Sequence, residues 1–345
     1  MARRTTALAL VTAVSACVAA LAPAGSVSAG TAVLPQARVF MVNPVQSTGD
    51  QGLADARDSA TAVPESAYAL AELRNLDPTG RIAGRWAYVR SETGGPATVA
   101  AAAAYDRRDD QFEQVMAYFW INEAQEYLQG LGFGTELRGA NNRQQPVRIN
   151  QWGRDNSVFT DRRGEIRFGK GGVDDAEDAE VILHEYGHAV HQAQVPGFGS
   201  SPEAGAIGEA FGDYLAVTVG EHAVGRYGWS RRADLACVAD WDSVSYSPAP
   251  HCLRRVDGDK TYADLEGQVH ADGEIWSRAL FDIRGALGAR TADRIIVNAQ
   301  FGFAPGTGFR DAALATIATA RAMYGDPEAE AVRAAFAARE IPGVA

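Results

Sequence analysis

The chain has 345 residues, of which 46% are apolar and 22% are charged, and both fractions are typical of a soluble globular protein. This composition excludes a mostly disordered chain and a membrane protein with many spans. With 32 Lys and Arg against 43 Asp and Glu, the formal net charge is −11. Because nucleic-acid binding needs a basic surface, the acidic balance predicts no nucleic-acid partner.

Residues 1–29 have the features of a secretory signal peptide. Two arginines precede an uncharged, Ala-rich run over Thr5–Leu21, and small residues before Gly30 fit a cleavage site. We therefore expect a secreted protein without a stable membrane partner, since no later apolar run is long enough to span a bilayer. The alternative is a lipoprotein anchored through Cys17, but the apolar run continues past this residue.

Removal of this segment would leave two cysteines, Cys237 and Cys252. Two thiols in an exported protein most often pair, so the sequence predicts a disulfide. A bridge that closes a loop of about 15 residues would stabilise the fold by about 3 kcal/mol in the chain-entropy model.

Short apolar runs alternate with Thr, Gly and Pro from residue 30 to about 105, a pattern typical of strands and turns. Two such runs are Ala37–Val42, which an Asn-Pro pair ends, and Arg85–Val89. The first part of the mature chain is therefore expected to consist mainly of strands and turns.

The period becomes helical over about 111–129, where apolar side chains recur every three to four residues and glycines follow. Strand-like segments come next at 154–160 and 164–169. After Asp174 most of the chain has helical spacing. The later helices are expected near 175–194, 202–219, 270–287, 289–300, 310–323 and 327–338. The order predicts an α+β fold, with a strand-rich lobe over 30–195 and a helical lobe over 196–345.

Residues 184–188 read His-Glu-Tyr-Gly-His. Histidines at positions i and i+4 lie on one helix face about 6 Å apart along the axis, so both imidazoles can bind one ion from the same side. Glu185 projects beside them and can take a proton from a metal-bound water. The sequence therefore predicts a zinc site with His184 and His188 as ligands and Glu185 as the base. Two histidines and a glutamate on a solvated face remain the alternative.

The third ligand must come from elsewhere in the chain. One class of zinc protease takes a third histidine six positions after the second, but here that position is Gln194. A second predicted helix carries Glu209 and Asp213 at i and i+4. Glu209 can ligate the metal, and Asp213 can accept a hydrogen bond from a ligand imidazole and fix its tautomer. Three protein ligands leave one position for water, which is typical of catalytic zinc.

This constellation resembles the thermolysin-type zinc metallopeptidases, and within them the fungalysin branch. The shared features are His-Glu-x-x-His, Glu-x-x-x-Asp about 20 residues later, and the segment His-Ala-Asp-Gly-Glu-Ile-Trp that begins at His270. The resemblance implies a two-lobed zincin-type fold, in which a central zinc-binding helix separates the strand-rich lobe from the helical lobe. It also implies that His270 stabilises the tetrahedral intermediate.

The resemblance further implies a set of substrate-binding residues. Asn156 and Ser157 stand where the family has an edge strand that holds the substrate backbone. Arg254 and Arg255 both fit the arginine that contacts the substrate carbonyl, and Arg255 is taken as the candidate. The sequence contains no clear calcium motif, so calcium binding is left open.

We therefore expect a secreted, monomeric zinc endopeptidase that acts on peptides or proteins. The first alternative is an exopeptidase of the same zinc class, which would need a site for a free terminus. The second is a binding module that keeps its zinc but not its activity. The third, surface histidines without metal, predicts a thermal midpoint that a chelator does not change.

Overall fold

A computed structural model describes Met1 and residues 34–230 and 233–344. The expected signal peptide at 1–29 and Cys17 lie outside the described residues. Residues 34–345 form one unit, to which the helices and strands belong. In the part of the chain that is described, no helix is long and apolar enough to cross a bilayer.

Two sheets build the first part of this unit. Strands β1 (Gln36–Phe40) and β2 (Tyr68–Glu72) pair antiparallel. The larger sheet has the order β3-β4-β6-β5, in which only β5 runs antiparallel to its neighbour. Its strands are β3 (Ala87–Ser91), β4 (Gln145–Ile149), β5 (Val158–Thr160) and β6 (Glu165–Arg167). Strand β5 is therefore an edge strand, and no other described strand pairs with its outer side.

Helices dominate the rest of the unit. The sequence predicted six of them after Asp174, and each begins and ends within a few residues of its expected position, except that the helix from Pro202 continues to Tyr227. The helices are α1 (Pro44–Thr48), α2 (Asp110–Gly130), α3 (Ala179–Gln194), α4 (Pro202–Tyr227), α5 (Val269–Leu287), α6 (Ala289–Gln300), α7 (Phe309–Met323) and α8 (Asp326–Ala337). The predicted α+β class is confirmed.

Short elements connect these helices and strands. Strands β7 (Cys237–Val238) and β8 (Arg254–Arg255) pair antiparallel, and the predicted disulfide between Cys237 and Cys252 is present beside them. The 3-10 turns are η1 (Ala60–Ala62), η2 (Glu65–Ala67), η3 (Val99–Ala101), η4 (Asp175–Glu177), η5 (Asp242–Ser245) and η6 (Tyr262–Asp264). The strand pairing and the disulfide thus hold the two ends of the segment between β7 and β8 together.

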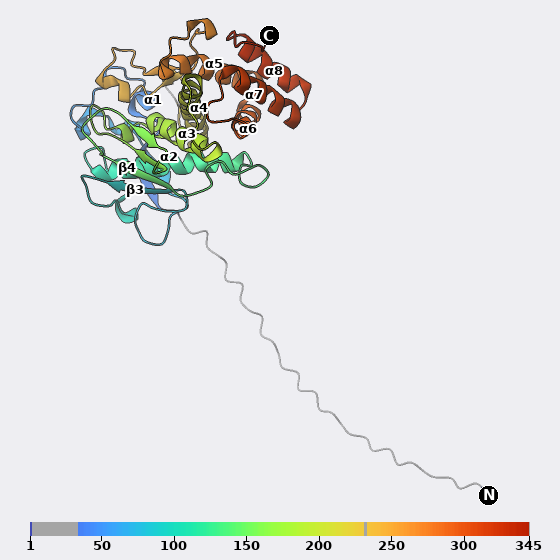
Figure 1. The fold of residues 1–345 in the computed structure, drawn as a ribbon. Helices are drawn as coiled ribbons and strands as arrows, with labels where there is room; N and C mark the ends of the chain where they lie inside the picture. The colour runs from blue at the N-terminus through green and yellow to red at the C-terminus, as the bar shows by residue number, and fades with distance from the viewer. Residues whose placement is uncertain (2–33, 231–232, 345) are drawn as a thin grey trace. The chain divides into compact units, whose positions relative to one another are not determined.

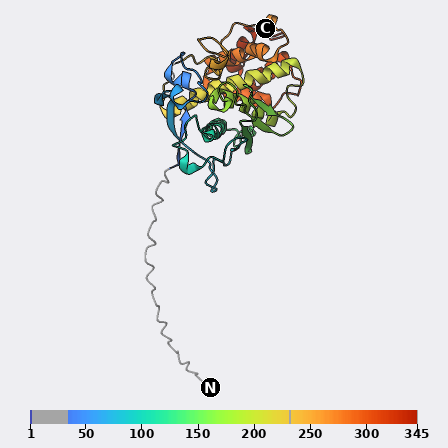
Figure 2. The same cartoon turned by 90° about the vertical axis from the view of Figure 1, so that its left-hand side faces the viewer.

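The arrangement separates strands from helices. Figure 1 shows β3 and β4 on one side of α2, and helices α3 to α8 on the other. Figure 2 shows the molecule from a second direction, with the C-terminal helices in orange and red above the teal segments. The helix with the His-Glu-x-x-His motif, α3, lies between the two parts.

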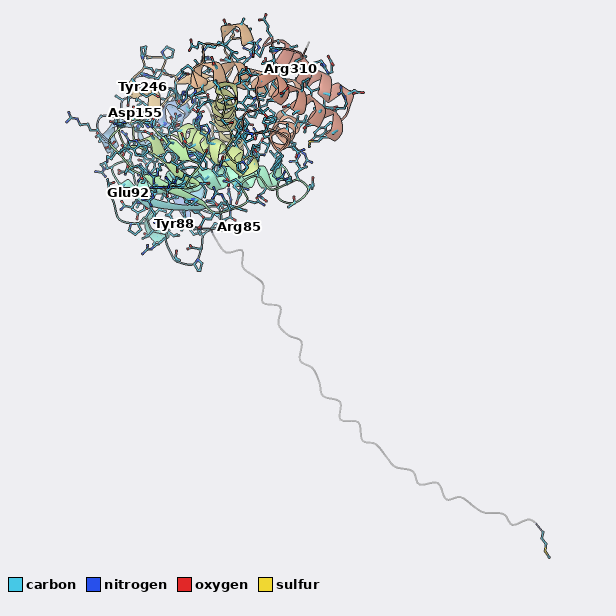
Figure 3. All side chains as sticks on the ribbon, in the orientation of Figure 1. Arg85, Tyr88, Glu92, Asp155, Tyr246 and Arg310 are labelled. Atoms are coloured by element: carbon cyan, nitrogen blue, oxygen red, sulfur yellow. A yellow bond between two sulfur atoms is a disulfide. The ribbon has the colours of Figure 1, made fainter. Side chains whose placement is uncertain are left out.

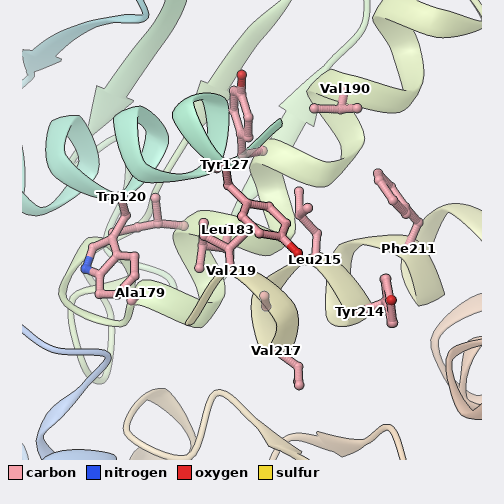
Figure 4. Packing of buried hydrophobic residues seen from close by; sticks show 14 of the residues in the cluster. Trp120, Tyr127, Ala179, Leu183, Val190, Phe211, Tyr214, Leu215, Val217 and Val219 are labelled. Atoms are coloured by element: carbon pink, nitrogen blue, oxygen red, sulfur yellow. The ribbon is translucent and has the colours of Figure 1, made fainter. Parts of the chain in front are cut away.

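Buried side chains from α2, α3 and α4 pack against one another in the middle of the unit (Figure 4). Trp120 of α2, Leu183 of α3 and Leu215 of α4 are each at most 1% exposed. Burial of apolar area is the main driving force for folding, at about 25 cal/mol per Å². This core therefore fixes α3 against both neighbouring helices.

Local signals set where α3 and α4 begin. The Ser201 side chain accepts a hydrogen bond from the Ala204 backbone N–H, and Pro202 occupies the first turn of α4; both residue types are favoured at these positions. At α3 the sequence predicts Asp174 or Asp175 as the cap, since the helix is expected to begin near residue 175, but this prediction is wrong. Asp178 caps the helix instead, because η4 takes up the residues just before it.

Candidate active site

The two histidines of α3 face Glu209 of α4. The Nε2 atoms of His184 and His188 lie 3.1 Å apart, and they lie 3.2 Å and 3.6 Å from the nearest Glu209 carboxylate oxygens. Ligand atoms around a tetrahedral zinc, at about 2.0–2.1 Å from the metal, are separated by about 3.3 Å. The spacing of these three side chains therefore fits one zinc ion.

The chemistry of the donor atoms also fits a metal. His184 Nδ1 lies 2.8 Å from Asp213 Oδ1, so the ring donates there and its Nε2 atom points toward Glu209 and His188. Burial lowers the pKa of His184, but hydrogen bonds with Asp213 and Glu209 outweigh this and raise the pKa to about 10. Burial lowers the pKa of His188 to about 4. Without a metal, a proton on His184 Nε2 would thus occupy the place between the rings and Glu209 that a zinc ion would take.

Asp213 connects the histidine to an arginine. Arg254 of β8 donates two hydrogen bonds of 2.7 Å to the Asp213 carboxylate, and both side chains are largely buried. Although burial opposes it, the positive charge of Arg254 helps to hold the pKa of Asp213 well below its usual range. Asp213 therefore stays ionised and can orient His184.

Glu185 lies on α3 next to the first histidine and is 6% exposed. Burial raises the pKa of Glu185 to about 7, although the charge of His184 and a hydrogen bond from the Phe159 backbone act in the opposite direction. A carboxylate with a pKa near neutrality can both accept and return a proton. Phe159 belongs to the edge strand β5, so Glu185 lies between the histidines and this strand.

His270 approaches the same group from α5. Its Nε2 lies 3.3 Å from Glu209 Oε2, its side chain is 49% exposed, and Nδ1 lies 3.0 Å from Gln268 Nε2. If Gln268 donates this bond, Nδ1 accepts it, and the proton of a neutral imidazole is then on Nε2. His270 can therefore donate a hydrogen bond at the open side of the site.

Two hollows meet at these residues. The larger one, of about 770 Å³, and its neighbour share Asn156, Ser157, His184, Glu185 and His270 in their walls. Asn156 and Ser157 come directly before β5. The predicted substrate-binding pair thus lies at the end of the edge strand, beside the predicted ligands.

The two candidate arginines have different positions. Arg254 lines the larger hollow, while Arg255 does not. The guanidinium of Arg255 lies 2.6 Å from Asp234 and 2.8 Å from Asp257, and it is 41% exposed. Consecutive residues of a strand point to opposite faces, so only one of the two reaches the cavity. In this geometry Arg254, rather than Arg255, is placed to contact a substrate.

His191, two helical turns after His184, is expected from the sequence to be a neighbour of the site or a surface residue; it is buried and lines the smaller hollow beside His188. Its ring stacks on Phe198 with 3.9 Å between centroids and contacts Phe211 edge-on. The pairing of Asp213 with Arg254 is what sequence reasoning did not single out. The only sequence feature that could have indicated this pairing is the position of Arg254, two residues after Cys252 of the predicted disulfide.

Comparisons with known proteins agree with this geometry. Residues 197–341 match the family model described as the thermolysin metallopeptidase, alpha-helical domain. Among solved structures, the chain is similar to the precursor of protealysin, a metalloproteinase from Serratia proteamaculans, with a TM-score of 0.56 at 16% identity. The match covers 79% of this chain and 91% of that chain, and it shows the fold.

No curated protein sequence matches the chain. The comparisons do not support its placement in the fungalysin branch, since the matching family model is that of thermolysin. The comparisons therefore support a metallopeptidase, in which residues 197–341 are similar to the alpha-helical domain of thermolysin.

Proposed function

We propose that this protein is a secreted zinc endopeptidase that hydrolyses internal peptide bonds with Glu185 as the general base. The observation that carries the proposal is the convergence of His184, His188 and Glu209 beside a buried Glu185. Secretion rests on the features of residues 1–29, and the disulfide agrees with an oxidising compartment.

The proposed roles follow from the positions of the side chains. A zinc ion held by His184, His188 and Glu209 would polarise the scissile carbonyl and lower the pKa of a water molecule. Glu185 accepts the proton of the attacking water and passes it to the nitrogen of the leaving amine.

Two further side chains would stabilise the transition state. His270 donates from Nε2 to the oxygen that becomes negative when the carbonyl is attacked, which is usually the largest contribution to catalysis. Arg254, held by Asp213, presents its remaining N–H groups to a carbonyl of the substrate. The free edge of β5, next to Asn156, would pair with the substrate backbone.

The shape of the site favours an endopeptidase over an exopeptidase. Beyond the residues that they share, one hollow is lined by the segments of β7 and β8, and the other by the residues before and at the start of α4. A substrate chain can therefore continue past the scissile bond on both sides. A binding module without activity is disfavoured because Glu185 and His270 both face the ligand group.

The test is Glu185→Gln, with Glu330→Gln on the exposed face of α8 as the matched control. The first variant should keep its zinc content and thermal midpoint but lose about 10²- to 10⁴-fold in kcat on a peptide blocked at both ends. The control should retain the wild-type rate. Full activity of Glu185→Gln would reject the assigned base, and wild-type cleavage of free-ended peptides alone would establish an exopeptidase.

A further inference from the structure

A second group of carboxylates lies in the wall of the larger hollow. Asp155, Asp175 and Asp242 each offer an oxygen, and these oxygens lie within 4.8 Å of one another. The three residues come from different segments: the loop before β5, the 3-10 turn before α3, and the segment between β7 and β8. Figure 3 shows Asp155 and Tyr246, another residue of this wall, on the same side of the unit.

Within the described residues, these carboxylates have no positively charged partner. Among the described residues, none of the three forms an ion pair with Lys or Arg. Asp175 and Asp242 are 2% and 5% exposed, and the Oδ1 atom of each is buried without a hydrogen-bond partner. A buried polar atom without a hydrogen-bond partner costs free energy. The two Oδ1 atoms therefore indicate a site for a positively charged hydrogen-bond donor.

Burial and repulsion between the carboxylates both raise the pKa values of Asp175 and Asp242. Burial raises the pKa of Asp175 to about 7, and the neighbouring Asp155 contributes to the increase. The pKa of Asp242 is also raised by burial, and then by the charges of Asp175 and Asp155. A cation between these groups would relieve the repulsion.

The Oδ2 atoms of Asp175 and Asp242 each accept a hydrogen bond from a neighbouring hydroxyl group. Ser157 Oγ donates to Asp175 Oδ2, and Tyr246 donates to Asp242 Oδ2 at 2.5 Å. These bonds orient the free Oδ1 atoms. Because Ser157 also borders the ligand group, the acidic group and the catalytic residues belong to one continuous cavity.

Apolar side chains form part of the wall of the cavity between the two groups, which Arg254 and Glu274 also line. The wall contains Val181, Val238, Ala239 and Leu253 in addition to the carboxylates. Lys and Arg side chains combine an apolar stem with a charged end group, and they place the stem along apolar surface. The combination of apolar walls and an acidic end matches such a side chain.

We propose that Asp155, Asp175 and Asp242 form a subsite that binds the Lys or Arg side chain of a peptide residue adjacent to the scissile bond. This inference rests on the proposed function and specifies its substrate: peptides with a basic residue at the cleavage site. A divalent cation is the other occupant to consider. Calcium takes about six to eight oxygen ligands, whereas this group offers two fixed carboxylate oxygens and one exposed carboxylate.

The experiment compares matched peptides. Cleavage of a peptide library by the wild-type protein gives the position of the preferred residue, and two blocked peptides then carry Lys or norleucine at that position. The kcat/KM ratio of the two peptides is measured for the wild type, Asp242→Asn, Asp155→Lys and the control Asp259→Asn. Asp259 is a fully exposed aspartate outside the cavity.

We expect the wild type and the control to prefer Lys at least about tenfold, and both cavity variants to lose about tenfold or more of this preference. Equal use of the two peptides by the wild type, or an unchanged ratio in both variants, overturns the subsite. If neither peptide is cleaved by the wild type, the proposed function itself fails.

Two measurements do not depend on turnover. Glu185→Gln should bind the Lys peptide more tightly than the norleucine peptide in calorimetry, and the addition of Asp155→Lys should remove the difference. Thermal midpoints show whether each variant folds. Metal analysis that finds a second divalent ion in the wild type, absent from Asp242→Asn, would assign the group to a metal and overturn the subsite.

Discussion

Gly187 of α3 faces Gly212 of α4 so closely that a Cβ atom on Gly187 would lie 2.8 Å from the Gly212 Cα. A Cβ on Gly212 would lie 2.6 Å from Nδ1 of His184. The two helices therefore meet backbone to backbone where the metal ligands converge. This contact allows Glu209 and Asp213 to reach the ring of His184 from the neighbouring helix.

Substitution of Gly212 is predicted to disturb this contact between the helices. Gly212→Ala should displace His184 or separate the helices, because the added methyl group has no space. We expect zinc affinity to fall about 10- to 100-fold and stability to fall by about 1–3 kcal/mol. The measurements are chelator competition for zinc and urea unfolding.

Gly225→Ala is the control for this variant, since it lies on the same helix and has open space around its Cβ position. It should stabilise the protein by about 0.5–1 kcal/mol and leave zinc binding unchanged. Wild-type zinc affinity in Gly212→Ala would show that the close contact does not position the ligands.

Asp213 is predicted to orient His184. Asp213→Asn replaces the acceptor of the His184 Nδ1 proton with an amide and removes the charge that pairs with Arg254. We expect zinc affinity to fall about 10- to 100-fold. Glu221 also lies on α4 and forms a partly exposed ion pair with Arg284 of α5. The control Glu221→Gln removes this ion pair and should change zinc affinity little. Equal affinities in the two variants would reject this role.

The disulfide is predicted to hold Arg254 in the cavity. It joins Cys237 of β7 to Cys252, two residues before Arg254, and closes a loop with a sequence separation of 15 residues. The double variant Cys237→Ser/Cys252→Ser should lose about 3 kcal/mol of stability. Its KM should rise more than its kcat falls if Arg254 mainly positions the substrate. Unchanged stability and kinetics would contradict both expectations.

The buried Asp175 is predicted to make stability fall as pH rises. Burial raises its pKa in the folded state to about 7, so the folded state holds the proton more tightly than the unfolded state. Its contribution to stability is present below the unfolded pKa of about 4 and is lost as pH rises toward 7.

The measurement for this prediction is the free energy of unfolding from pH 4 to 8 for the wild type and Asp175→Asn. The wild type should lose stability relative to the variant across this window, because an amide does not titrate. A difference between the two proteins that is constant with pH would mean that Asp175 is not titrating there.

The helices of this protein were predictable because their signals are local. The period of apolar residues and caps such as Ser201 depend on neighbours within a few positions in the chain. The start of α3 shows where local signals are insufficient, because the cap is Asp178 and not Asp174 or Asp175. Several acidic residues precede this helix, and the packing of η4 decides which of them is the cap.

The sequence by itself determined that His184 and His188 share a helix face, because their spacing matches one helical turn whatever surrounds it. The sequence also predicted Glu209 as their partner, since the periodicity of apolar residues identifies both helices. The choice of Arg254 over Arg255 and the meeting of Asp155, Asp175 and Asp242 were decided only by the tertiary structure. Those distances join segments far apart in the chain, and they depend on how closely the segments pack rather than on any local preference.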